Sequence, residues 1–314
     1  MKVKVKDETN LFAWEKHLED FLLTKKVEGC RDRTIKDYDY HVNQFFKEYP
    51  YALEDQGKLQ FSIRCYFTSE CAPGTFNIRR SNLKAYFNFL MSEGIIQKNP
   101  ITFQKRKDEE KKYQIPQDAL IKLLSLPNKS TFAGLRDYCL MLITLDSGIR
   151  PQEALNLLID DIDLNNLEIT VRKEIAKTKT SRTLPITPIT AMQIRKIIKA
   201  RPSNWTFRTP VFCSFSGEAM LESSWSHQLK KYSKILDLSI TPYSLRHCFA
   251  LFYLRNGGNV FTLQRTMGHT DLNMTKRYLA LTNQDLLREH QFASPINFLV
   301  ENVFGKLEII HCGT

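Results

Sequence analysis

Four side chains in this sequence have the chemistry to hold and attack a phosphodiester. Arg246, His269 and Tyr278 follow one another within a short stretch, and Arg150 precedes them in the motif SGIRPQEAL. Two guanidinium groups can clamp the oxygens of one phosphate, and an imidazole can add a hydrogen bond. A tyrosine hydroxyl can then attack phosphorus. Together these residue types predict the transfer of a phosphoryl group to a protein side chain.

The neighbours of Arg150 and Tyr278 suit these roles. Pro151 fits the first position of a helix, which leaves Arg150 just outside it, beside backbone N–H groups that favour anions. Glu153 can pair with Arg150, either in a surface ion pair or as the group that orients it. The ordinary pKa of tyrosine is about 10. The two cations before Tyr278 in TKRYL favour the ionised form of its hydroxyl.

The segment KTKTSRTLPI adds a candidate proton donor. Apolar and polar residues alternate over 167–171 and again over 184–186, so the segment between them is expected to form the tip of a β-hairpin. A lysine on such a hairpin can reach into a groove and protonate a leaving oxygen. Composition alone does not choose among Lys173, Lys177 and Lys179.

The composition favours a polyanionic partner. The chain has 45 lysine and arginine residues against 34 aspartate and glutamate residues, a formal net charge of +11, which favours nucleic acid. Its seven cysteines form no CxxC pair, so neither a zinc site nor a disulfide framework is expected. The sequence has no P-loop motif, no secretory signal and no apolar run long enough to span a membrane. These features favour a cytoplasmic protein and agree with a reaction that uses no cofactor and no metal.

In the N-terminal third, apolar residues at helical spacing predict four helices. They lie before Gly29, after a cap at Thr34, over 59–69 and over 75–92. The last of them is expected to bury Ile78, Tyr86, Phe89 and Leu90. Basic residues on the polar faces are predicted to contact DNA phosphates, and they are Arg31, Arg33, Lys36, Arg79, Arg80 and Lys84.

After the charged stretch QKRKDEEKKY, which is typical of a linker, the pattern is again mainly helical. A helix is expected to open at Pro116, and an apolar helix over 135–145 should end at Gly148. The first of these is predicted to turn inward Leu120, Ile121, Leu123 and Leu124. A small antiparallel sheet is expected between 160 and 186. The helices predicted after it lie near 189–200, 223–236, 244–256, 260–267 and 273–279.

The chain resembles the tyrosine recombinases, the family of phage-type integrases and Xer-like site-specific recombinases. The matching motifs, in order, are SGIRPQEAL, KTKTSRTLPI, TPYSLRHCFA and MGHTDLNMTKRYL. The resemblance is strong over 114–290 and weaker over 11–103. It implies a mainly α fold with a small antiparallel β-sheet in the C-terminal domain, in a two-domain C-shaped clamp. The implied domains are a helical, SAM-like core-binding domain over 1–103, a linker over 104–114, a catalytic domain over 115–290 and a tail over 291–314 that packs on a neighbouring subunit.

The resemblance also implies a role for each matching residue. The implied catalytic residues are Arg150, Lys177, Tyr243, Arg246, His269 and Tyr278, with Glu153 in support. The arginines and His269 would bind the scissile phosphate, and Tyr278 would be the nucleophile. Lys177, five residues before Arg182 in the chain, would protonate the departing 5′-oxygen.

One position departs from the family pattern H-x-L-R-H. This chain reads YSLRH, with Tyr243 in the place of the first histidine. A tyrosine can hydrogen-bond a phosphate oxygen, but it does not shuttle protons near neutral pH as an imidazole does. The proton acceptor for Tyr278 is therefore unassigned, and stabilisation of the transition state by the arginines is expected to carry more of the rate. We expect His247 to be a packed residue rather than the acceptor, since it points about 100° away from Arg246 on the helix.

The implied function is site-specific DNA recombination through a 3′-phosphotyrosyl intermediate, in integration, excision or resolution. The implied assembly is a homotetramer on two paired sites of double-stranded DNA, with room for an accessory directionality factor, in the bacterial cytoplasm at the nucleoid. Three alternatives stay open. They are a type IB topoisomerase-like enzyme that relaxes DNA, a non-catalytic DNA-binding protein, and a helix-turn-helix regulator. The intact catalytic set argues against the second, and the third leaves Lys177 and Tyr278 unexplained. The target sequence and the element that is moved are not encoded in any motif.

Overall fold

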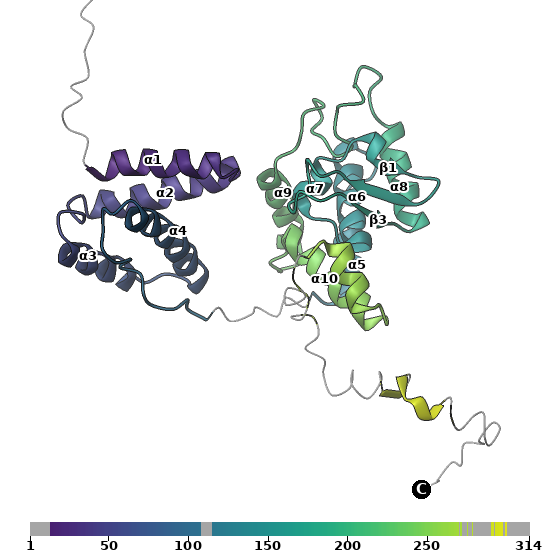
Figure 1. Cartoon of the computed structure of the whole chain (residues 1–314). Coiled ribbons are helices and arrows are strands. Elements are labelled where there is room, and N and C mark those ends of the chain that lie inside the picture. The colour runs from purple at the N-terminus through teal and green to yellow at the C-terminus, as the bar shows by residue number, and fades with distance from the viewer. Residues whose placement is uncertain are drawn as a thin grey trace, which may run out of the picture. The chain divides into compact units, whose positions relative to one another are not determined.

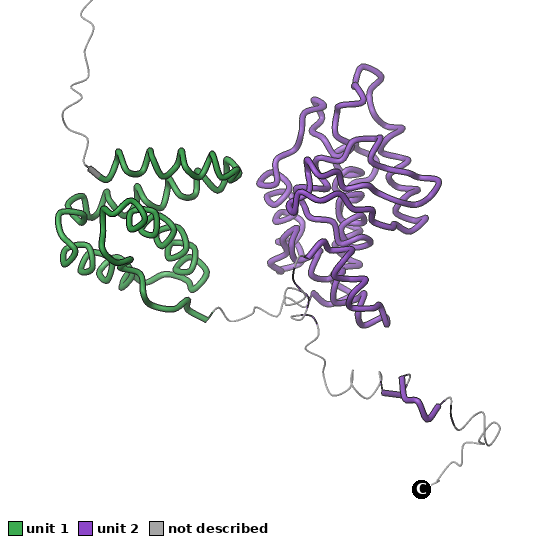
Figure 2. Tube along the Cα trace, in the orientation of Figure 1, with its two compact units in different colours: residues 1–111 green, residues 112–314 purple. Residues whose placement is uncertain are grey.

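The computed structural model describes residues 13–107, 115–269, 271, 275, 278, 290–291, 293–297 and 299. The chain forms two compact units, residues 1–111 and 112–314 (Figure 1, Figure 2). The boundary between them falls inside the stretch 104–114 that the charge pattern predicts to be a linker. In the part of the chain that is described, no helix is long and apolar enough to cross a membrane.

The first unit consists of helices around an aromatic core. They are α1 (Ala13–Val27), α2 (Asp32–Glu48), α3 (Gln56–Thr68) and α4 (Pro73–Ser92). Phe21, Phe45, Phe46, Tyr86 and Phe87 are fully buried between them, and many of their rings meet edge to face. Large aromatic side chains such as these bury much apolar area per residue, which suits the core of a small unit.

Two predictions about these helices are wrong. Thr34 is not a cap, because α2 already begins at Asp32, whose charge suits the positive end of the helix dipole. Ile78 is 54% exposed, because the buried face of α4 follows Phe76, Leu83 and Leu90, which lie about two turns apart from one another.

The basic residues of this unit fall into two groups. Arg31, Arg33 and Lys36 are exposed, and Arg79 and Lys84 are partly exposed. The prediction that Arg80 lies on a polar face is wrong. Arg80 is buried, and its Nε donates a hydrogen bond to the carbonyl of Phe103 at 2.8 Å. It joins α4 to the segment that follows the helices, and this position leaves little of it for a phosphate.

The second unit surrounds a three-stranded antiparallel sheet with helices. Its elements are α5 (Gln117–Ser125), α6 (Phe132–Ser147), α7 (Pro151–Leu155), the 3₁₀ helix η1 (Ile159–Asp161), β1 (Ile162–Asp163), β2 (Glu168–Val171), β3 (Arg182–Pro185), α8 (Pro188–Lys199), α9 (Glu222–Ile235), α10 (Pro242–Arg255) and α11 (Val260–Met267). The strands pair in the order β1-β2-β3, with Ile169 opposite Leu184 and Val171 opposite Arg182. The mainly helical fold and the small sheet agree with the sequence expectation.

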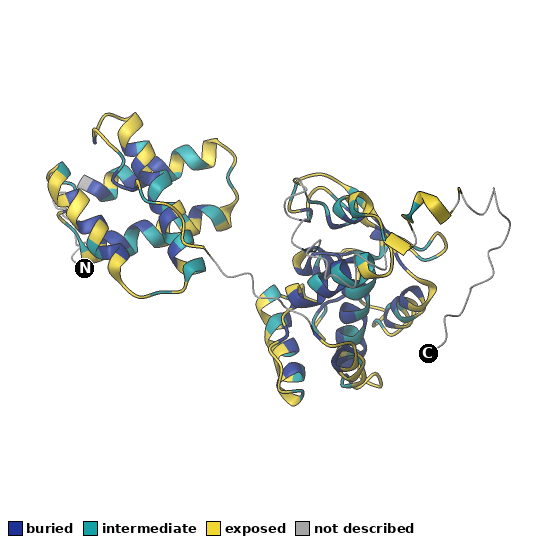
Figure 3. Ribbon diagram, turned by 90° about the horizontal axis from the view of Figure 1, so that it is seen from below, coloured by how far each residue is buried: buried dark blue, intermediate teal, exposed yellow. Residues whose placement is uncertain are grey.

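Helix α6 is the centre of this unit. It packs against α5, α7, α8 and α10, and buried residues run along the inside of both units in Figure 3. The helix ends at Gly148 as predicted, in the left-handed region at a φ of 63°. A Cβ atom there would lie 2.2 Å from the ring of Phe249 on α10. Only glycine therefore lets the chain turn so close to α10.

The first helix of this unit buries less than predicted. Leu120 and Leu123 lie in the core, but Ile121 is 62% exposed. Helix α5 has only nine residues and presents one narrow face to α6. The predicted helix over 273–279 and the tail over 291–314 lie mostly outside the described residues.

Candidate functional site

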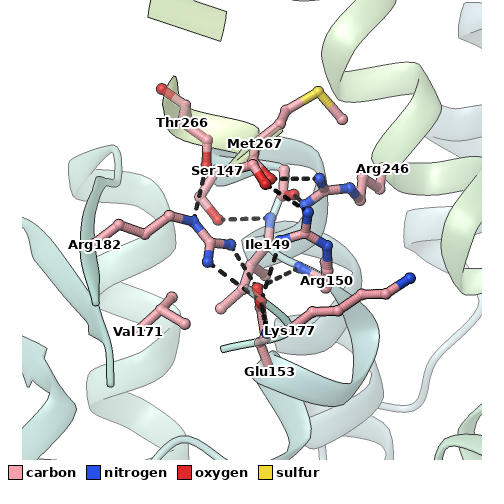
Figure 4. Close-up of polar contacts among 12 residues, drawn as sticks. Ser147, Ile149, Arg150, Glu153, Val171, Lys177, Arg182, Arg246, Thr266 and Met267 are labelled. Carbon is pink, nitrogen blue, oxygen red and sulfur yellow. Dashed lines mark hydrogen bonds and ion pairs between the residues drawn. The ribbon is translucent and has the colours of Figure 1, made fainter. Parts of the chain in front are cut away.

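Three arginines from three different elements meet at the C-terminal end of α11 (Figure 4). Arg182, Arg246 and Arg150 donate hydrogen bonds to the carbonyls of three consecutive residues, 266 to 268, at 3.2, 2.7 and 2.8 Å. The last carbonyls of a helix have no partner within it and carry the negative end of its dipole. The guanidinium groups satisfy them, and in doing so they lie next to one another.

Glu153 on α7 joins two of these arginines. Its carboxylate accepts hydrogen bonds from Arg182 at 3.2 and 2.5 Å and from Arg150 at 3.2 Å. It also accepts the backbone N–H of Lys177 at 3.2 Å. Glu153 is 1% exposed and Arg150 is 7% exposed. Their contact is therefore buried and orients Arg150, and the alternative of a simple surface ion pair is wrong.

The carboxyl of Glu153 is held in its charged form. Burial by itself raises the pKa of this group, but the hydrogen bond and charge of Arg182 and the charge of Arg150 lower it below its ordinary value. An ionised carboxylate can accept all of these donors at once. Glu153 therefore fixes the positions of both guanidinium groups rather than one.

The local backbone explains where Arg150 stands. Gly148 ends α6 in a left-handed conformation, and Pro151 begins α7 at its first position, as predicted. Arg150 is the residue between the two helices, with extended backbone angles of −70° and 143°. Arg246, on α10, donates a further hydrogen bond to the carbonyl of Gly148. The turn that places Arg150 thus also holds Arg246.

The charges of this cluster do not cancel. Three guanidinium groups and one carboxylate, 3 − 1, leave a net charge of +2 on Arg150, Arg182, Arg246 and Glu153. Burial and then the charge of Arg150 lower the pKa of Arg246, which is 4% exposed. Grouped, buried cations are unfavourable unless an anion approaches them. A phosphate diester is an anion of the right size and geometry.

His269 lies beside this cluster. Gly268 ends α11 in the left-handed region, and His269 follows it directly. The Nε2 atom of His269 is 3.3 Å from a terminal nitrogen of Arg246, and its Nδ1 atom is 2.8 Å from the hydroxyl of Thr275. The structure therefore brings together Arg150, Arg246 and His269, which the sequence predicts to share one phosphate.

Lys177 and Tyr243 both lie near this cluster. Lys177 lies in the connection between β2 and β3, and its exposed side chain extends away from the Glu153 carboxylate in Figure 4. Tyr243 lies in the first turn of α10 and is 42% exposed. Burial and then Glu222 raise the pKa of the Tyr243 hydroxyl, whereas the charges of Arg246 and Arg150 oppose that rise. These interactions place Tyr243 within the field of both arginines.

The hydroxyl of Tyr278 contacts His247, a partner that the sequence does not predict. A hydrogen bond joins Nδ1 of His247 to the Tyr278 hydroxyl, and the two ring centres are 5.7 Å apart. His247 does point away from Arg246 along α10, as the helix geometry requires. Tyr278, however, packs against the cluster formed by Phe249, Ala250, Leu263 and Met267, and so reaches α10 from that side. Tertiary packing decides this contact, so the local sequence holds no signal for it.

Arg182 is the residue of the site that sequence reasoning missed. It pairs with the buried Val171 and lies two residues before the buried Leu184, so its side chain shares the inner face of the sheet. An arginine on the buried face of a strand requires an anionic partner. Side chains two residues apart on a strand point to the same face, so the spacing of Arg182 and Leu184 in the segment SRTLP is the signal that would have identified Arg182.

The described residues include no group of three histidine, cysteine, aspartate or glutamate side chains that could hold a metal ion.

The sequence similarity of this chain to known proteins identifies its family. The sequence profile of the phage integrase family matches residues 114–285, more than half of the chain. The chain belongs to the phage integrase family.

Curated relatives of this family member are similar over nearly their whole length. Tyrosine recombinase XerA of Pyrococcus horikoshii is 27% identical over 291 residues, which cover 92% of this chain and 95% of the relative. Tyrosine recombinase XerC of Thermodesulfovibrio yellowstonii is 26% identical over 289 residues, covering 87% and 94%. The chain is thus similar to tyrosine recombinases in both units.

Solved structures share the fold. The Tn1549 transposon integrase, in complex with transposon right end DNA, has a TM-score of 0.69 at 19% identity, covering 88% of this chain and 99% of that one. A lambda integrase dimer bound to a COC′ core site has a TM-score of 0.68 at 18% identity, covering 84% and 76%. At these identities the likeness establishes architecture, and the roles of the residues are argued from the site itself.

Proposed function

We propose that this chain recombines DNA at specific sites by cutting and rejoining strands through Tyr278. Its hydroxyl oxygen attacks the scissile phosphorus, the bond from phosphorus to the 5′-oxygen breaks, and the strand stays attached by a 3′-phosphotyrosyl bond. A 5′-hydroxyl from a partner strand then attacks that bond and frees Tyr278. Each step exchanges one phosphodiester for another, so the reaction needs no external source of energy.

The observation that carries this proposal is the excess of buried positive charge beside a tyrosine and a histidine. Arg150 and Arg246 would bind the two non-bridging oxygens of the phosphate, with His269 as a third donor. In the transition state these oxygens gain negative charge, and donors already aimed at them stabilise it more than the ground state. Removing one such donor typically slows a reaction by about 10²–10³-fold.

The remaining residues supply proton transfer and positioning. Lys177 protonates the departing 5′-oxygen, and its backbone hydrogen bond to Glu153 ties its position to that of the arginines. Tyr243 donates a hydrogen bond to a phosphate oxygen while its hydroxyl stays neutral. Glu153 and Arg182 hold the arginines in place without touching the phosphate.

The rest of the chain would bind and pair the DNA. We propose residues 1–103 as the core-binding domain, residues 115–290 as the catalytic domain and residues 291–314 as a tail that contacts a neighbouring subunit. Two paired sites would hold a homotetramer, with an accessory directionality factor where one direction is favoured. The element moved would be a mobile one in the bacterial nucleoid.

Covalent capture from a randomised library of duplexes tests this proposal and identifies the target sequence in the same experiment. Each duplex carries one 5′-bridging sulfur in place of oxygen, because the released thiolate does not readily attack back and the adduct accumulates. Wild-type protein should enrich one sequence in adducts that survive denaturation. Tyr278→Phe should bind the enriched duplex equally well and form no adduct.

Two results would contradict the proposal. One is an adduct formed by Tyr278→Phe, and the other is a wild-type protein that captures no sequence at all. Relaxation of a supercoiled plasmid that lacks the enriched sequence would instead favour a topoisomerase-like activity.

A further inference from the structure

The nucleophile of the proposed reaction has a specific neighbour on α10. The Tyr278 hydroxyl is hydrogen-bonded to Nδ1 of His247, the residue directly after the phosphate-binding Arg246. The two rings are tilted by 46° with their centres 5.7 Å apart. His247 itself is half-buried.

We propose that His247 is the proton acceptor for Tyr278 in strand cleavage, an inference that rests on the proposed function. The neutral imidazole of His247 carries its one N–H proton on Nε2, which leaves Nδ1 able to accept another. As the tyrosine oxygen bonds to phosphorus, the tyrosine proton moves to Nδ1. The bond to the 5′-oxygen breaks, and that oxygen takes a proton from Lys177. In rejoining the steps reverse, so the protonated His247 returns its proton to the Tyr278 oxygen as the strand leaves.

The residue at position 243 makes such an acceptor necessary. Tyr243 stands near both arginines, yet a neutral phenol has no basic lone pair that can take a proton near neutral pH. Burial raises the pKa of its hydroxyl further, which keeps it neutral. The arginines keep their protons near neutral pH and cannot accept one either.

The charges around the pair favour proton transfer. Arg246 is close enough to Tyr278 to interact with it electrostatically, and its guanidinium and a Tyr278 phenolate attract each other. That attraction stabilises the phenolate that forms as the proton leaves. His269 is engaged with Thr275 and with Arg246 itself. His247 thus acts on the tyrosine and His269 on the phosphate.

The rate of adduct formation on the captured duplex tests this assignment. General-base catalysis is typically worth about 10²–10⁴-fold, so we expect His247→Ala to slow cleavage by at least about 10²-fold. His247→Asn retains a hydrogen-bonding group near the position of Nδ1 but accepts no proton, and it should be as slow. Added imidazole should restore cleavage by His247→Ala at least about tenfold, with saturation, because a free base can occupy the vacated space.

The outcomes are separable from those of the proposed function. Wild-type adduct in the same assay establishes the reaction itself, and an unchanged gel shift of each variant on the duplex shows that it is folded and binds DNA. The assignment is overturned if His247→Asn cleaves at the wild-type rate, since a hydrogen bond alone would then suffice. It is also overturned if His247→Ala keeps the wild-type rate, or is slow but gains nothing from imidazole.

Discussion

Arg182 on β3 and Glu153 on α7 face each other in a bidentate contact, in which the two terminal guanidinium nitrogens each donate to a different carboxylate oxygen, at 3.2 and 2.5 Å. The third nitrogen of Arg182 reaches the carbonyl of Thr266 at the end of α11. One side chain therefore ties the sheet to α7, which directly follows Arg150, and to α11, which ends two residues before His269. Because the planar fork of an arginine makes all three bonds at once, a lysine cannot reproduce them.

Arg182→Lys should lower both stability and cleavage. Loss of part of a buried, hydrogen-bonded ion pair typically costs about 3–5 kcal/mol when one partner is removed, and the retained charge should bring the loss to the low end of that range. Cleavage should fall about tenfold or more, because Glu153 no longer holds Arg150 firmly. Urea unfolding and the capture assay measure the two effects. Arg195→Lys, at an exposed arginine on α8, is the matched control and should leave both unchanged.

Glu153 should contribute a stability that disappears in acid. Its pKa in the folded protein is lowered from the ordinary value of 4.5, so the unfolded chain takes up the proton first as the pH falls. The stability difference between wild type and Glu153→Gln should be full above pH 4.5 and should shrink as the pH falls toward the folded pKa. Urea unfolding at a series of pH values measures this difference. A difference that stays constant or grows in acid would contradict the ion-pair role, and Glu168→Gln, exposed on β2, should show no such trend.

Gly268→Ala should disturb the site beyond its backbone strain. Gly268 has a φ of 60°, and an added Cβ would lie 3.1 Å from Nε of Arg182 and 3.3 Å from a terminal nitrogen of Arg150. Gly257 also has a positive φ, 84°, but a Cβ there meets nothing within 4 Å. Both alanine variants should lose about 1–2 kcal/mol of stability from strain, and only Gly268→Ala should also slow adduct formation. Equal effects of the two on cleavage would refute the crowding.

Lys177→Ala should be rescued by a better leaving group. On an ordinary duplex with a 5′-oxygen, we expect cleavage to fall by about 10²–10⁴-fold, the usual contribution of a general acid. With a 5′-bridging sulfur the leaving thiolate needs no proton, since thiol pKa values are near 8.5, and the variant should approach the wild-type rate. Lys173→Ala, exposed in the same connection, should be normal on both duplexes. A defect of Lys177→Ala that is equal on oxygen and sulfur would rule out the acid role.

Alanine substitutions at Arg33 and Arg80 should affect DNA binding and folding of the first unit separately. Arg33 is exposed, whereas Arg80 is buried on the carbonyl of Phe103. Arg33→Ala should weaken binding to all duplexes and leave the free energy of unfolding unchanged. The slope of log K for DNA binding against log salt concentration should fall by about one, the equivalent of one lost phosphate contact. Arg80→Ala should lower the unfolding free energy by about 1–3 kcal/mol, because it leaves a carbonyl unpaired. Filter binding over a range of salt, together with thermal unfolding, distinguishes the two.

The sequence was most informative where chemistry and local backbone rules act together. Gly148 favours a left-handed helix end and Pro151 favours the first position of a helix, so the two residues predict the turn around Arg150 that the structure has. Helices α10 and α11 lie close to the predicted ranges 244–256 and 260–267, and the side chains of Thr241 and Asn259 cap their first turns. Periodicity failed at the edges of faces, as at Ile78 and Ile121, where the width of the buried stripe depends on the neighbouring helix.

What the sequence did not reveal depends on contacts between distant segments. The fork of Arg182 on Glu153 requires that β3 and α7 be neighbours, and the contact of Tyr278 with His247 requires a particular approach to α10. Helix geometry correctly directed His247 away from Arg246, but it does not say which segment lies on that side. Arg80 was misplaced for the same reason, because its partner, the carbonyl of Phe103, lies outside its own helix.

The row of arginine bonds on the last carbonyls of α11 also bears on the thermodynamics of DNA binding. A free arginine side chain loses up to about 2 kcal/mol of rotamer entropy when it is fixed. In Arg150, Arg182 and Arg246 this loss occurs when the protein folds, since helix ends and Glu153 hold all three without DNA. An arriving phosphate then meets side chains that are already ordered. Its binding should therefore show little of the entropic penalty, and little of the slow rearrangement, expected where flexible cations must first be gathered around an anion.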